Sequence, residues 1–232
     1  MAVKQRAMAT AEKAERRQAI LDAAESLYLD HPDRIANVAE VASTAGLAKG
    51  TVYLYFPSKE EMLLSLHERN VGRFFSELVR ALETRESIGF DEIFEVTRTN
   101  ILRPPGYLPL TSRCFGLMDR EIPLDTAIAF KMRVGQALAT AGPLLERHFA
   151  ALRAGDGITL LLQSYGLIVG MWQLMHPNER FGAAMDQPGL RMFKRDYERE
   201  VEKALRALWS GMIARNESAS PAKEPAARRR TK

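Results

Sequence analysis

The clearest chemical feature of the sequence is an anion site, expected where Ser58 opens a helix. Ser58 can cap this helix, and Glu61 stands three residues later, which is the spacing of a capping box. The first amide groups of a helix have no backbone partner, and the helix dipole places a partial positive charge at the same end. This helix start therefore suits an anion such as a phosphate group.

Residue types that bind metals or attack substrates are too scattered to form a site. His31, His67, His148 and His176 are far apart in the sequence, and Cys114 is the only cysteine. A single thiol cannot form an internal disulfide or a zinc site, which favours a reducing cytoplasm, and the charged start of the chain argues against a secretory signal. No Ser-His-Asp pattern or glycine-rich phosphate loop is visible, so we expect no catalysis, no metal and no cofactor.

Two very short helices are expected just before the anion site, at about Val38–Ala45 and Ala48–Leu54. Asn37 can cap the first of them, with Glu40 in the box position, and Gly46 can adopt the left-handed conformation that ends it. Helices this short are unstable in isolation, so they must pack on the helices before and after them. The product is a helix-turn-helix, whose second helix can enter the major groove of DNA.

The remaining pattern is also helical, because apolar residues recur at helical spacing and no run alternates cleanly with period two. We therefore expect an all-α protein of about nine helices in all. Beyond the two short helices, the expected ranges are about Ala9–Leu29, Ser58–Leu82, Asp91–Leu102, Leu108–Met118, Pro123–Leu152, Ile158–Met175 and Leu190–Ala214.

Charge alone does not identify a partner. The net charge is +4, and residues 221–232 account for all of this excess, so the folded body is about neutral. Residues 216–232 are rich in Ser, Ala, Pro, Lys and Arg, which predicts a disordered basic tail, either simply solvated or in weak contact with phosphates.

The segment Ile158–Met175 approaches the length of a membrane-spanning helix. Gln163, Ser164 and Gln173 interrupt its apolar character, and no basic cluster flanks it. We therefore interpret it as a buried helix of an interface and expect no membrane partner.

The spacing AxxAGLxxGTVYxYFxSKEEM, which begins at Ala42, resembles the signature of the TetR family of transcriptional regulators. The pattern covers about residues 15 to 65. The resemblance implies an N-terminal arm and three-helix helix-turn-helix DNA-binding domain over residues 1–57. It also implies a larger helical ligand-binding and dimerisation domain over residues 58–215.

The resemblance also implies which residues touch DNA. Lys49 would reach a base edge or a phosphate, Thr51 would supply a hydroxyl and a methyl group, and Tyr53 and Lys59 would bind phosphates. Ala48 stands where the family often has serine, and Ala39 where a longer polar residue often reaches a base, so base readout would depend on few side chains. The full set expected at DNA is Asn37, Lys49, Gly50, Thr51, Tyr53, Tyr55 and Lys59.

A homodimer is expected, because the resemblance implies that the last two long helices form a four-helix bundle with a second copy. Small residues would allow close helix approach and apolar residues would be buried between the copies. The interface residues expected from this pattern are Leu160, Leu161, Ser164, Leu167, Ile168, Gly170, Met171, Val201, Leu205, Leu208, Trp209 and Met212.

A pocket for a small apolar or amphipathic effector is expected among the middle helices, again from the resemblance. Its expected wall contains Phe94, Tyr107, Phe115, Met118, Met132, Gln136, Trp172 and Met175. The corresponding function is a homodimeric repressor that leaves a palindromic double-stranded operator when the effector binds. The alternative is a DNA-binding regulator without a small-molecule ligand, acting structurally or through a protein partner; a packed core would favour it.

Overall fold

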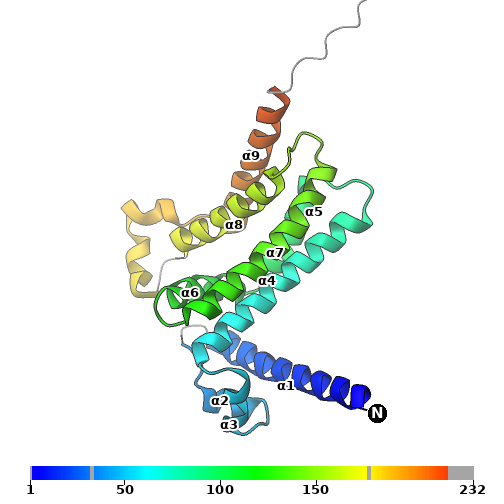
Figure 1. The fold of residues 1–232 in the computed structure, drawn as a ribbon. Helices are drawn as coiled ribbons and strands as arrows, with labels where there is room; N and C mark the ends of the chain where they lie inside the picture. Colours follow the sequence, from blue (N-terminus) through cyan, green and yellow to red (C-terminus); the bar gives the residue numbers. More distant parts are fainter. Residues whose placement is uncertain (1, 32–33, 177–178, 219–232) are drawn as a thin grey trace, which may run out of the picture.

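The computed structural model describes residues 2–31, 34–176 and 179–218, and these residues form helices and loops with no strand (Figure 1). The all-α prediction is therefore confirmed. The α-helices are α1 (Ala2–Asp30), α2 (Val38–Thr44), α3 (Lys49–Tyr55), α4 (Lys59–Thr84), α5 (Phe90–Thr97), α6 (Tyr107–Arg120), α7 (Leu124–His148), α8 (Asp156–Met175) and α9 (Tyr197–Ser218).

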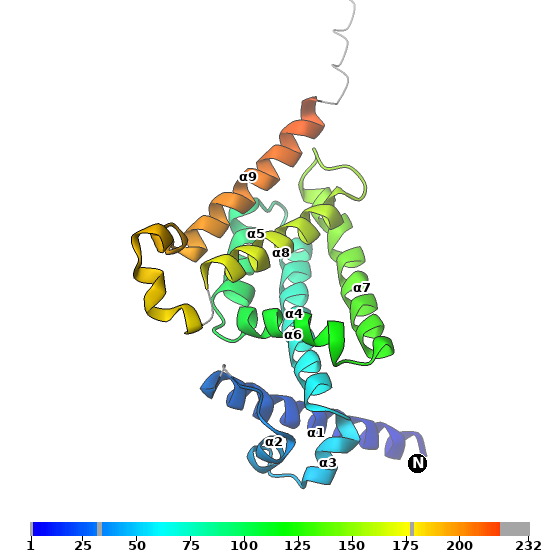
Figure 2. The same ribbon diagram turned by 90° about the vertical axis from the view of Figure 1, so that its left-hand side faces the viewer.

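The helices α1, α2 and α3 form a small module around the first turns of α4 (Figures 1 and 2). Its core is made by Ile20 and Leu21 of α1, Val41 of α2, Val52 of α3 and Met62 of α4, all of them buried. This packing supplies the neighbours that the two short helices need. The same apolar cluster continues into α6 and α7, so packing as well as the single helix α4 joins the module to the rest of the protein.

The helices α4 to α9 form a larger bundle, in which α7 lies against α4 and α8, and α8 lies against α9 (Figure 2). Two glycines let α7 and α8 approach closely. A Cβ atom on Gly157 would overlap the carbonyl group of Gly142, and one on Gly142 would lie 2.6 Å from a side-chain carbon of Ile158. Gly155 precedes α8 with a φ of +92°, a conformation that favours glycine.

The last helix differs from its prediction at both ends. The segment Pro188–Phe193 forms a short 3-10 helix, and α9 begins only at Tyr197, seven residues after the predicted start at Leu190. The helix then continues to Ser218, into the predicted tail, because the buried Asn216 donates a hydrogen bond of 2.6 Å to Asp156. The rest of the predicted tail, residues 219–232, lies outside the described residues.

Other helix boundaries were also misplaced. The helix α1 begins at Ala2 rather than Ala9, and α7 ends at His148 rather than near Leu152. The predicted helix over 91–102 is α5 followed by a π-helical turn at Arg98–Leu102, which ends before Pro104 and Pro105. A second 3-10 segment, Glu179–Asp186, follows α8.

Candidate DNA-binding surface and ligand cavity

The turn between α2 and α3 has the predicted local geometry. Gly46 has a φ of +67°, in the left-handed region. The side-chain oxygen of Asn37 accepts hydrogen bonds from the amides of Ala39 (2.9 Å) and Glu40 (3.1 Å), and the Glu40 carboxylate accepts one from the amide of Asn37 (2.8 Å). The hydrogen bond from Arg34 holds the pKa of Glu40 below its usual value. Asn37 therefore caps α2, and its expected contact with DNA stays a prediction.

The helix α3 buries only one side chain, Val52, and presents most of its surface to solvent. Lys49 and Tyr53 are exposed neighbours, with the lysine ammonium 5.9 Å from the centre of the tyrosine ring. A Cβ atom on Gly50 would meet nothing within 4 Å, so the backbone is open to close approach at this point. Thr51 is half-buried beside them.

Leu54, which the sequence analysis did not single out, is the most exposed large apolar side chain of the described residues, at 81%. It lies four residues after Gly50, on the same outward face of α3 opposite the buried Val52. This helical position, opposite an apolar residue that faces the core, is the signal that could have predicted the exposure of Leu54. A leucine offers no hydrogen bond, so this ridge can make only apolar contacts, such as those with a thymine methyl group.

The start of α4 completes this surface. Ser58 accepts a hydrogen bond of 3.1 Å from the amide of Glu61, which confirms the predicted cap. Lys59 is half-exposed, with its ammonium 3.6 Å from the Glu60 carboxylate. Tyr55 is half-buried, whereas the neighbouring Phe56 is fully packed in the small module. The surface thus offers two cations and an exposed phenol beside an open stretch of backbone.

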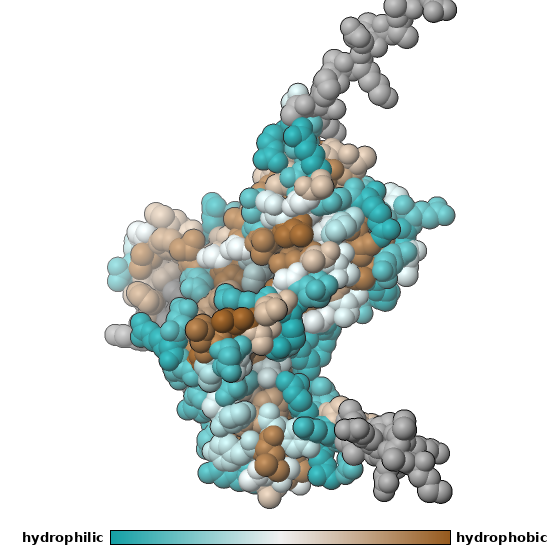
Figure 3. Space-filling view, in the orientation of Figure 1, coloured by the Kyte–Doolittle hydropathy of each residue, from teal (hydrophilic) through white to brown (hydrophobic). Residues whose placement is uncertain are grey.

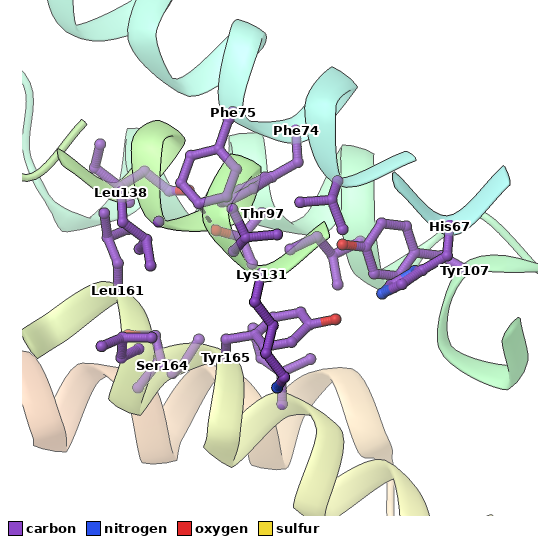
Figure 4. A pocket seen from close by; sticks show the side chains of 18 of the residues that line it. His67, Phe74, Phe75, Thr97, Tyr107, Lys131, Leu138, Leu161, Ser164 and Tyr165 are labelled. Carbon is purple, nitrogen blue, oxygen red and sulfur yellow. Dashed lines mark hydrogen bonds between the residues drawn. The ribbon is translucent and has the colours of Figure 1, made fainter. Parts of the chain in front are cut away.

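The larger bundle encloses a cavity of about 340 Å³ (Figure 4). Of the predicted wall residues, Phe94, Tyr107, Phe115 and Met118 line it. Its other aromatic lining residues were not predicted, and they are His67, Phe74, Phe75, Phe90, Phe130, Tyr165 and Trp209. Several of them lie at helical spacing on α4, but that spacing cannot show that the opposite helices leave a space between them.

Four predicted wall residues do not line the cavity. Met132 and Gln136 lie on the outward side of α7, with Met132 70% exposed. Trp172 instead stacks on His176 and packs edge-on against the ring of Tyr197, and Met175 packs against the main core. The helical phase of α7 turns Met132 and Gln136 away from the space. Trp172 and Met175 instead share the face of Ile168 but lie one and two turns beyond it, past the last residue of α8 that lines the cavity. These four residues therefore do not match the observed cavity wall.

Apart from Lys131, the polar groups that line the cavity carry little charge. His67 is almost completely buried, and burial lowers its pKa to about 4, so it is neutral at physiological pH. Its Nδ1 atom lies 3.5 Å from the Thr111 hydroxyl. Burial also raises the pKa of the phenols of Tyr107 and Tyr165. The Tyr165 oxygen lies near Tyr107 and Thr111 but makes no well-formed hydrogen bond.

Most of the predicted interface residues turn out to be covered by their own chain. Side chains on the inner faces of α8 and α9 pack in the core of the bundle, so they cannot reach a second copy as predicted. These residues are Leu160, Leu161, Ile168, Val201, Leu205, Trp209 and Met212. The Trp209 indole also donates a hydrogen bond of 3.0 Å to Ser164. The remaining predicted residues are half-buried or exposed, and they are Ser164, Leu167, Gly170, Met171 and Leu208.

The outer face of α8 is the apolar surface that the chain leaves uncovered. Leu162 and Leu174 are more than half exposed, and Gly166 and Gly170 lie open between them. By length and composition alone α8 could cross a membrane, and only 22% of its apolar window is buried. Apolar patches also interrupt the polar surface over the larger bundle in Figure 3.

Fold and site together define a helix-turn-helix protein with a DNA-binding module and a cavity in the attached bundle. The chain belongs to the TetR family of transcriptional regulators. The family model for bacterial regulatory proteins of the tetR family matches residues 20–66, and the model for the Tetracyclin repressor-like C-terminal domain matches residues 68–216.

Known relatives match only part of this chain. The Fatty acid metabolism regulator protein of Bacillus subtilis is 37% identical over 59 residues, which is 25% of this chain and 30% of the relative. The regulator EthR of Mycobacterium tuberculosis is 44% identical over 59 residues, 25% of this chain and 27% of EthR. The chain therefore aligns with less than a third of the length of these relatives.

Similarity to solved structures extends further. A TetR-family transcriptional regulator from Streptomyces coelicolor has a TM-score of 0.52 and 22% identity, over 85% of this chain and 97% of the other. At this identity the likeness shows the shared fold alone.

Proposed function

We propose that this protein is a homodimeric repressor, which leaves a palindromic operator when a small apolar or amphipathic molecule enters its cavity. In this proposal residues 1–57 bind DNA and residues 58–215 bind the effector and the second copy. The single observation that supports it best is that α4 reaches both sites. Lys59 begins α4 on the DNA-facing module, and His67, Val71 and Phe74 of the same helix line the cavity.

The proposed switch is a shift between two dimer geometries. A molecule that fills the cavity presses on α4, and a tilt of α4 moves α3 relative to α3 of the second copy. A coupling of about 1–3 kcal/mol would lower operator affinity about 5- to 150-fold. The presence of a cavity of about 340 Å³ favours this repressor over a regulator without a ligand, for which we would expect a filled core.

The proposed dimer uses the outer face of α8. Leu162 and Leu174 supply apolar area, and the two open glycines, Gly166 and Gly170, permit close approach of a helix from the second copy. Two copies place two α3 helices on DNA, which is how short recognition helices obtain enough contacts for a specific site.

The DNA surface is tested by the salt dependence of binding. We expect Lys59→Ala to weaken binding to all duplexes alike and to reduce the slope of log affinity against log salt by about one per subunit, because one phosphate contact is lost. Fluorescence anisotropy of a labelled duplex, taken from the DNA flanking the encoding gene, measures this slope. Tyr53→Phe should likewise weaken binding uniformly, whereas Lys49→Ala or Thr51→Ala should change the base preference.

The matched control is Lys203→Ala on α9, whose ammonium pairs with Glu200 far along the chain from α3. This variant should keep the wild-type slope. An unchanged slope for Lys59→Ala would remove Lys59 from the DNA surface.

A further inference from the structure

The mouth of the cavity holds a cation, the ammonium group of Lys131. Lys131 of α7 lines the cavity (Figure 4). Phe115 of α6 lines the same cavity, and both Phe115 and Lys131 are exposed to solvent, so the opening lies between α6 and α7. Within the described residues Lys131 makes no ion pair and no hydrogen bond, whereas its neighbour Arg133 pairs with Glu68.

The interior of the cavity offers no charge of the opposite sign. None of its lining residues is Asp or Glu, and the lining is otherwise apolar apart from neutral groups such as His67 and the two phenols. Among the described residues, Lys131 is therefore the only cationic side chain that lines the cavity. Lys131 is exposed at the mouth, where an anionic head group can accept a charge-assisted hydrogen bond from its ammonium group.

The cavity is elongated. Its lining residues run along α4 from His67 to Phe75 and along α7 from Phe130 to Leu138. Eight residues of α-helix correspond to about 12 Å at 1.5 Å per residue. A chain-like apolar group fits such a space better than a compact polar one does.

We propose that the cavity binds an amphiphile with an anionic head, such as a medium-chain carboxylate, and that Lys131 binds this head at the mouth while the apolar chain lies along α4 and α7. This inference rests on the proposed function, because it names the chemical class of the effector. A cationic amphiphile would meet a like charge and no carboxylate. A neutral one would shield Lys131 from water without giving it a counter-charge.

Two ligands that differ only in the head group test the inference. Isothermal titration calorimetry at pH 8 and low salt compares decanoate with 1-decanol, both below the concentrations at which they aggregate. Wild-type protein should bind decanoate about tenfold more tightly than decanol, which is the scale of a hydrogen bond to a charged group. Lys131→Gln should abolish this preference and leave the affinity for decanol unchanged. Lys131→Glu should instead favour a cationic head group, so this variant should bind decyltrimethylammonium more tightly than decanoate.

Lys203→Gln on α9 is the matched control, because it removes an exposed ammonium that does not line the cavity, and it should keep the tenfold preference. If Lys131→Gln still prefers decanoate, or if the wild type binds both ligands alike, the head does not bind at Lys131, and the inference fails while the apolar effector site stands. If neither ligand binds the wild type, the proposed effector site fails as well.

Discussion

At the scale of single residues, the buried His67 of the cavity wall should make the stability of the protein depend on pH. Its ring packs against Tyr107 and Phe130, with ring centres 6.0 and 5.7 Å away. Burial lowers its pKa to about 4 in the folded protein, from about 6.5 in an unfolded chain. The unfolded state therefore binds more protons between these two values, and the free energy of unfolding must fall as the pH drops through this range.

We expect His67 to contribute a loss of about 2 kcal/mol of stability between pH 7 and pH 5. Urea unfolding followed by tryptophan fluorescence measures this loss, and His67→Leu should lack it. Burial also lowers the pKa of His176, but that histidine is present in both proteins and cancels in the comparison. Parallel losses of stability in the wild type and the variant would mean that His67 is not held neutral by burial.

Residue roles were predictable where a local rule decides them. Asn37 and Ser58 cap their helices and Gly46 turns the chain, because capping and a positive φ depend on neighbouring backbone only. The sequence did not single out Lys131 and Leu54, because their roles depend on their surroundings. Lys131 lies at an apolar mouth without carboxylates, and Leu54 is left largely exposed on α3.

At the scale of elements, the contact between α7 and α8 sets the shape of the bundle. Gly142 and Gly157 bring the two backbones together where any side chain would collide. The sequence predicted both helices, and it gave no sign that these two glycines face each other. It also could not show which side of α8 the chain itself covers, since that helix is apolar around most of its circumference.

Gly157→Ala should destabilise the protein by about 1–3 kcal/mol or more, because the added methyl group must push α8 away from α7. Gly72→Ala is the matched control in the middle of α4, where a Cβ atom meets nothing within 4 Å. It should stabilise the protein by up to about 1 kcal/mol through helix propensity. Chemical denaturation compares the two variants, and equal stabilities would contradict the close contact of α7 with α8.

At the scale of the whole molecule, the helix α4 connects the two sites, and the apolar cluster of the small module extends into α6 and α7 as far as Phe130 at the cavity. The all-α architecture and the family could be predicted, because the helical periodicity and the motif that begins at Ala42 are local features of the sequence. Half of the predicted cavity wall and much of the predicted interface could not be predicted correctly. Both depend on the rotation of α7, α8 and α9 about their axes, and the wall also depends on where along α8 the cavity ends. Such rotations are fixed only when all the helices pack together.

The central claim, that two copies of α3 read DNA together, is tested most directly by selecting binding sites from a pool of random duplexes with the wild-type protein. We expect an inverted repeat whose half-sites lie about 10 base pairs apart, or a multiple of that distance, centre to centre. Tyr53→Phe should select the same sequence with lower affinity. A single asymmetric site, or no enrichment at all, would contradict the account.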